Sequence, residues 1–112
     1  MTSIKFPFDI DKFFEKYAKN KTLPKNDFEK QAILIKLIEL FEDSKKYKEE
    51  EVNEKIKKCF EDYALLRREL INFGYLQRNP YIGEYWVVKR NLTKEDIENN
   101  TLLRRHAKAY NI

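Results

Sequence analysis

The fold is decided by residues 47–86, YKEEEVNEKIKKCFEDYALLRRELINFGYLQRNPYIGEYW. This stretch predicts a helix over residues 48–60 and a second helix that is capped by Asp62 and stopped by Gly74. Two aromatic-rich strands are predicted next, on either side of a turn at residues 79–83. This order is typical of a winged helix-turn-helix, whose second helix usually contacts a nucleic acid or another protein.

The flanking segments are predicted to be helical. Asp9 or Asp11 is expected to cap a short first helix, and Asp27 to cap a longer second helix that is apolar almost all round. Thr93 followed by Asp96 predicts a capping box at the start of a last helix, which runs in pieces to the C-terminal end. The predicted elements are helices at residues 8–19, 27–41, 48–60, 62–73 and 93–110, and strands at residues 75–78 and 84–88. The expected fold class is mainly α (α+β), winged-helix-like, with extra helices at both ends.

Length and composition predict one domain. The chain has 112 residues, of which 42% are hydrophobic, which suits a single domain with a modest core. We expect a helical extension over residues 1–22, a winged-helix core over residues 23–88 and a helical tail over residues 89–112.

The same features favour a cytoplasmic protein. The single Cys59 has no partner for an internal disulfide, as is usual in a reducing compartment. No apolar run approaches the roughly 18 residues that span a bilayer, and the N-terminus lacks the pattern of a signal peptide. We therefore expect no membrane partner.

Arginine is distributed unevenly along the chain. The formal net charge is +4, and all six arginines lie at or after position 67, whereas 14 of the 17 lysines lie before position 60. Arginine binds phosphate, base edges and carboxylates with two parallel hydrogen bonds better than lysine does. The alternative is that these arginines pair with the chain's own glutamates or cover aromatic surface.

The second helix of the motif presents candidate contacts to double-stranded DNA. A helical wheel places Arg68 outward, Arg67 at the flank and Asn72 one turn beyond Arg68. Further basic residues are expected on the wing strands, placed to touch phosphates. The predicted nucleic-acid contacts are Arg67, Arg68, Asn72, Arg78, Lys89 and Arg90. Arg67 has a structural alternative, a bridge to Glu51 or Glu54 on the preceding helix.

A protein-interaction or dimerisation module is the alternative function. Glu61 and Asp62 place negative charge at the helix end that a DNA reader would insert into a groove. Leu65 and Ile71 are apolar on the same expected outward face and suit a protein partner or a second copy of the chain. The sequence leaves DNA and a protein partner, including a homodimer, both open.

Nothing in the sequence indicates catalysis. The single His106 lies in a basic tail and is expected to be a solvated surface residue, and Cys59 faces inward as a small hydrophobe. One Cys and one His cannot form a zinc site, and the acidic run at residues 49–51 lacks the spacing of a calcium loop. We expect no enzyme activity, no cofactor, no metal and no small-molecule ligand.

The central stretch resembles a small bacterial family named domain of unknown function 2087, whose members occur alone or as a tail on ArsR-type regulators. The resemblance covers Leu23 to Val88. It is carried by Tyr47, Glu51-Val52-Asn53, Asp62-Tyr63, Leu66-Arg67-Arg68-Glu69-Leu70, Gly74, Leu76, Arg78 and Tyr85-Trp86. The resemblance implies a winged-helix-like domain with a role in transcriptional regulation, and it implies no ligand.

Overall fold

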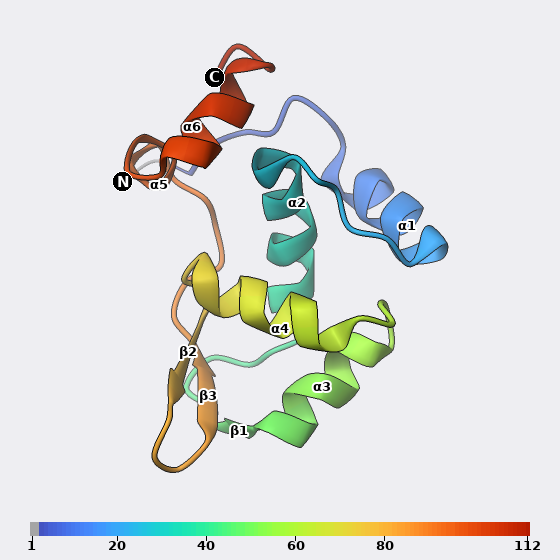
Figure 1. Ribbon diagram of the computed structural model, residues 1–112, viewed down its shortest axis with the longest axis vertical. Coiled ribbons are helices and arrows are strands. Elements are labelled where there is room, and N and C mark those ends of the chain that lie inside the picture. The colour runs from blue at the N-terminus through green and yellow to red at the C-terminus, as the bar shows by residue number, and fades with distance from the viewer. Residues whose placement is uncertain (1–2) are drawn as a thin grey trace.

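The computed structural model describes residues 3–112, which form six helices and three short strands (Figure 1). The helices are α1 (Ile10–Asn20), α2 (Asp27–Ile38), α3 (Glu49–Lys57), α4 (Tyr63–Asn72), α5 (Lys94–Glu98) and α6 (Thr101–Lys108). The strands are β1 (Tyr47–Lys48), β2 (Leu76–Asn79) and β3 (Glu84–Val87), and they form one antiparallel sheet in the order β1-β3-β2. The fold is α+β, as predicted, and the order α3, α4, β2, β3 is the order predicted for a winged helix-turn-helix.

Helix α2 is the centre of the molecule (Figure 1). Eight of its twelve residues are buried, because α1, α4 and α6 all pack against it. In the view of Figure 1, α1 and the α5–α6 pair lie on opposite sides of α2, and α4 crosses its lower end above α3 and the sheet. The apolar residues on several faces of α2 therefore reflect packing against three other helices of the chain.

The helix boundaries follow local capping chemistry. The carboxylates of Asp9 and Asp62 accept backbone N–H bonds at the starts of α1 and α4, as predicted. Thr93 and Asp96 form the predicted capping box of α5. Gly74 follows α4 with φ +81, a left-handed conformation that glycine adopts without steric cost.

Two predicted features of α2 are wrong. Its N-cap is Asn26, whose side chain accepts a bond from the Glu29 N–H, while Asp27 is the first helical residue. The helix also ends at Ile38 rather than near Phe41, and the following residues form tighter i→i−3 turns. A residue far along the chain binds this last segment, since Arg90 donates to the carbonyl oxygens of Ile38 and Phe41.

The sheet explains the aromatic pattern of residues 75–88. Strand β1 pairs with β3 through Tyr47 opposite Tyr85, and both residues are buried. Successive side chains of β3 point to opposite faces of the sheet. Val87 packs against the core, whereas Trp86 on the other face is half-exposed with the Lys46 ammonium 3.7 Å from its ring centroid.

The buried residues of all these elements form one hydrophobic cluster, from Phe28 on α2 to Ala107 on α6. Partly buried aromatic residues of the N-terminal segment pack against it, including Phe6 and Phe8. Within residues 3–112, no helix is long and apolar enough to cross a membrane.

Candidate functional site

A hollow of about 290 Å³ lies between α4 and the β2–β3 wing. We call it the α4–wing hollow, and its lining residues are Glu49, Arg67, Arg68, Ile71, Asn72, Arg78 and Tyr85. Four of the six predicted nucleic-acid contacts, Arg67, Arg68, Asn72 and Arg78, thus meet at one place although they come from two elements. Glu49 and Tyr85 were not predicted as site residues. Glu49 resembled an ordinary acidic first turn of a helix, and Tyr85 an ordinary core position of a strand.

Arg67 is engaged inside the protein. Its guanidinium donates a hydrogen bond to the Asn53 side-chain oxygen, and its Nε lies 3.8 Å from the Glu49 carboxylate. Only 17% of the side chain is exposed. The predicted structural alternative of a bridge to the preceding helix is therefore correct, but the partners are Asn53 and Glu49, not Glu51 or Glu54.

Glu49 places one carboxylate at the inner wall of the hollow. The buried Tyr85 hydroxyl donates to it at 2.8 Å. Burial and this hydrogen bond raise the pKa of Tyr85 above its ordinary value. The side of the hollow near Arg67 is therefore already neutralised by the protein itself.

The other two arginines of the hollow are not paired with acidic side chains of residues 3–112. Arg68 on α4 and Arg78 on β2 are both exposed, and neither forms an ion pair with any residue from 3 to 112. The Arg78 guanidinium lies 5.8 Å from the Tyr85 ring centroid, which orients it beside the wing. The exposed Asn72 amide donates to Glu69 at 3.1 Å and keeps its carbonyl oxygen at the surface. The rim therefore offers two guanidinium groups and one amide.

Lys89 and Arg90 lie outside the hollow. They were expected on the wing strands, but β3 ends at Val87, so this placement is wrong. The Lys89 ammonium lies 3.3 Å from the Asp96 carboxylate and 4.7 Å from the Tyr75 ring centroid.

Arg90 holds the C-terminal end of α2. Its guanidinium donates to the carbonyl oxygens of Ile38 at 3.0 Å and Phe41 at 2.6 Å, and to the Asp43 carboxylate at 2.9 Å. The Ile38 carbonyl also accepts a bond from the Phe41 N–H at 3.1 Å, so Arg90 adds a second donor at this helix end. Arg90 therefore has a capping role that the local sequence does not reveal.

The expected apolar face of α4 is absent. Leu65 and Ile71 are half-buried and pack against the core, instead of projecting outward. Neighbouring segments cover these two side chains in part. Leu65 lies beside the connector at residues 21–23, and Ile71 lies beside the wing, where it lines the hollow. The apolar side chains most exposed at the wing are instead Tyr81, at 94%, and Ile82, at 63%, on the turn between β2 and β3.

His106 is not the solvated residue expected from the sequence. Its Nδ1 accepts a hydrogen bond from the Asp27 N–H at 2.8 Å, and only 29% of its side chain is exposed. It therefore acts as a second cap of α2, supplied from α6. Cys59 is half-buried, and burial raises the pKa of its thiol, which disfavours the reactive thiolate. Within residues 3–112 there is no group of three or more His, Cys, Asp or Glu side chains placed to hold a metal ion.

The chain belongs to the DUF2087 family, described as an uncharacterized protein conserved in bacteria, whose family model matches residues 20–87. The match includes α2, α3, α4 and all three strands, and with them every residue that lines the α4–wing hollow. It does not include α1, apart from that helix's last residue, or α5 and α6. No curated protein and no solved structure matches the chain.

Proposed function

We propose that this chain is a non-catalytic winged-helix domain that binds double-stranded DNA and serves in transcriptional regulation. The observation that carries the proposal is the α4–wing hollow, where Arg68 and Arg78 stand unpaired on the two elements that a winged helix uses for binding. In this arrangement a DNA phosphate lies between the two guanidinium groups, and Asn72 faces the groove.

The distribution of engaged and free cations supports this assignment. Arg67, Lys89 and Arg90 are held by groups of the protein itself, so they stabilise the fold. Arg68 and Arg78 add little to the fold and are free to neutralise phosphate. With so few contacts, the proposed binding is of moderate strength and depends strongly on salt.

The proposal is tested by fluorescence anisotropy with a labelled random-sequence duplex at about 50 and about 200 mM salt. We expect binding that weakens steeply with salt. In the double variant Arg68→Ala/Arg78→Ala, the affinity should fall about tenfold or more, and the slope of log K against log salt should become shallower by about 1.8, since each phosphate contact contributes about 0.9.

A matched control removes the same charge elsewhere. Lys19→Ala/Arg105→Ala changes two exposed cations on α1 and α6, neither of which forms an ion pair within the described part of the chain. It should bind DNA almost as the wild type does. Equal losses in both double variants, or no binding by folded wild-type protein at the lower salt concentration, would contradict the proposal.

A protein-interaction or dimerisation module remains the second candidate function. The observation that favours it is the exposure of Tyr81 and Ile82 at the wing turn, because exposed aromatic and aliphatic side chains are typical anchors of interfaces. This candidate predicts a dimer in sedimentation experiments that Tyr81→Ser/Ile82→Ser converts to a monomer, while DNA binding is absent. A monomer that binds DNA would exclude it as the main function.

A further inference from the structure

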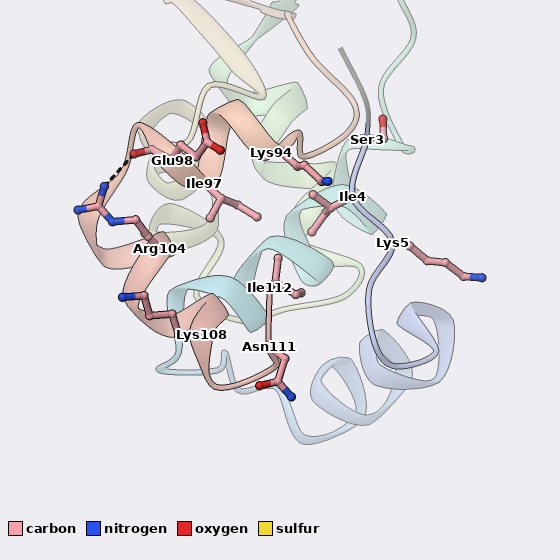
Figure 2. A pocket seen from close by; sticks show the side chains of 10 residues that line it. All are labelled: Ser3, Ile4, Lys5, Lys94, Ile97, Glu98, Arg104, Lys108, Asn111 and Ile112. Carbon is pink, nitrogen blue, oxygen red and sulfur yellow. Dashed lines mark hydrogen bonds between the residues drawn. The ribbon is translucent and has the colours of Figure 1, made fainter.

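A second hollow, larger than the α4–wing hollow, lies at the opposite end of the molecule, between the N-terminal segment, α5 and α6 (Figure 2). We call it the α5–α6 hollow, and its volume is about 660 Å³. Ligand pockets in proteins commonly have volumes of about 300–1,000 Å³. Its lining residues are Ser3, Ile4, Lys5, Lys94, Ile97, Glu98, Arg104, Lys108, Asn111 and Ile112.

Backbone pairing builds one wall of this hollow. Ser3 forms a β-bridge with Thr93, and the Ile4 N–H donates to the Leu92 carbonyl at 2.9 Å. These bonds hold the N-terminal segment beside the start of α5. The opposite wall is α6, which is fixed to α2 by the bond between the Asp27 N–H and His106.

The interior of the α5–α6 hollow is apolar. Ile4, Ile97 and Ile112 come from three separate segments, and their side chains point toward one another in the centre of Figure 2. Ile97 is 5% exposed and forms the floor, whereas Ile112 is 41% exposed and forms part of the rim. An apolar group of a ligand would replace water at this surface.

Four cations line the rim of this apolar interior. Lys94 lies beside Ile4 and faces the hollow, whereas the head groups of Lys5, Arg104 and Lys108 point away from it (Figure 2). None of these four cations forms an ion pair with any residue from 3 to 112.

Arg104 is oriented without being neutralised, because its guanidinium donates to the backbone carbonyl of Glu98 at 3.3 Å. Glu98 is the one acidic residue among those that line the hollow. The rim therefore has an excess of positive charge around an apolar floor.

From this arrangement we infer that the α5–α6 hollow is a binding site for an organic anion with an apolar body, such as a medium-chain carboxylate. The chain of the ligand packs on Ile4, Ile97 and Ile112, and its carboxylate accepts a hydrogen bond from Lys94, the cation that faces the hollow. All residues that line the hollow lie outside residues 20–87, the segment that matches the family. Helix α2, which holds α6 through the Asp27–His106 hydrogen bond, lies within that segment. The inference does not depend on DNA binding at the α4–wing hollow.

The test uses three probes that separate charge from apolar surface, with the full chain and isothermal titration calorimetry. Decanoate carries both features, decanol carries only the apolar chain, and acetate carries only the carboxylate. We expect decanoate to bind and to bind at least about tenfold more tightly than decanol, because a charge-assisted hydrogen bond is lost with the neutral head group. Acetate should show no measurable binding.

Variants locate the binding within the molecule. Lys94→Ala should weaken decanoate binding about tenfold and leave decanol binding nearly unchanged. Ile112→Asp, at a partly exposed position that tolerates a polar residue, should abolish binding of both. The matched control is Arg105→Ala, an exposed neighbour on α6 that does not line the hollow, and it should bind decanoate as the wild type does.

Circular dichroism confirms that each variant is folded before titration. No decanoate binding by folded wild-type protein would overturn the inference. Equally strong binding of decanoate by Lys94→Ala, or equal affinities of the wild type for decanoate and decanol, would also overturn it, because Lys94 would then have no part in recognition.

Discussion

Both hollows of this protein are lined by several cations, but the other side chains that line them differ. In the α4–wing hollow, Glu49 lies beside Arg67 and accepts a hydrogen bond from the Tyr85 hydroxyl. In the α5–α6 hollow, three isoleucines occupy the interior, and no carboxylate within residues 3–112 pairs with the surrounding cations. The first is therefore partly neutralised by its own chain, and the second is not.

This difference separates cations that hold the fold from cations that are free for a ligand. A guanidinium becomes structural where a neighbouring element supplies a carbonyl or a carboxylate, as α2 does for Arg90 and α3 does for Arg67. Where only apolar or solvent-facing neighbours are present, as around Arg68 or Lys94, the charge stays available. The number of basic residues in a region is thus a poor guide to binding.

The largest expected effect is on stability and tests Arg90, a cation that we assign to holding the fold. Arg90→Ala removes donors from two carbonyl oxygens at the end of α2 and from Asp43, so the free energy of unfolding should fall by about 2 kcal/mol. Urea denaturation measures the change. Arg105→Ala removes the same charge from an exposed site and should shift the free energy by less than about 0.5 kcal/mol. Similar values for the two variants would mean that the Arg90 contacts contribute nothing to stability.

Adjacent arginines on α4 give the next largest effect. Arg67→Ala leaves Asn53 and Glu49 without their donor in a partly buried place, and should cost about 1.5 kcal/mol of unfolding free energy. Arg68→Ala should cost less than about 0.5 kcal/mol, because Arg68 is exposed and unpaired. The same urea experiment compares them. A loss of stability in Arg68→Ala that equals the loss in Arg67→Ala would remove the distinction between the two residues.

A smaller effect concerns the carboxylate within the α4–wing hollow. Glu49→Gln keeps an oxygen that can accept the Tyr85 hydrogen bond but removes the negative charge. We expect DNA affinity at low salt to rise about threefold, the size of one weak charge interaction in water. Anisotropy titration measures this change, and Glu54→Gln, at an exposed position of α3 outside the hollow, is the control. An unchanged or lower affinity would show that Glu49 does not oppose binding of an anion.

The smallest predicted effect concerns the pH at which Tyr110, just after α6, loses its proton. The Tyr110 hydroxyl donates to Glu29, and this bond raises the pKa of Tyr110 to about 12, from an ordinary value of 10.0. Because the folded state holds this proton more tightly, the bond stabilises the fold below pH 10, and that contribution is lost as the pH rises toward 12. Ultraviolet titration of phenolate should lose one group near pH 12 in Tyr110→Phe. A lost group near pH 10 would contradict the assigned bond.

Local chemistry made much of the fold predictable. The caps at Asp9, Asp62 and Thr93 and the stop at Gly74 depend on residues within a few positions of each other, so the sequence displays them directly. The wing strands were predicted to within one residue of β2 and β3. The clustering of four predicted contact residues around α4 and the wing follows from the same local order of elements.

The parts that could not be predicted depend on partners far along the chain. Arg90 reaches carbonyls about fifty positions earlier, at residues 38 and 41, and His106 reaches a backbone N–H 79 positions earlier. A helical wheel gives the direction of Arg67 but does not identify Asn53 and Glu49 as its partners. The wheel also placed Leu65 outward, because it contains no information about the connector that faces it.

The most direct test of the central proposal is a ¹H–¹⁵N NMR titration of the full chain with a short duplex of random sequence. We predict that the amide signals of α4 and of the β2–β3 wing shift on DNA addition, while those of α5 and α6 stay in place, and that the shifts vanish in Arg68→Ala/Arg78→Ala. Shifts concentrated on the basic surface of α6, or no shifts at all at low salt, would contradict the assignment of the α4–wing hollow as the DNA-binding site.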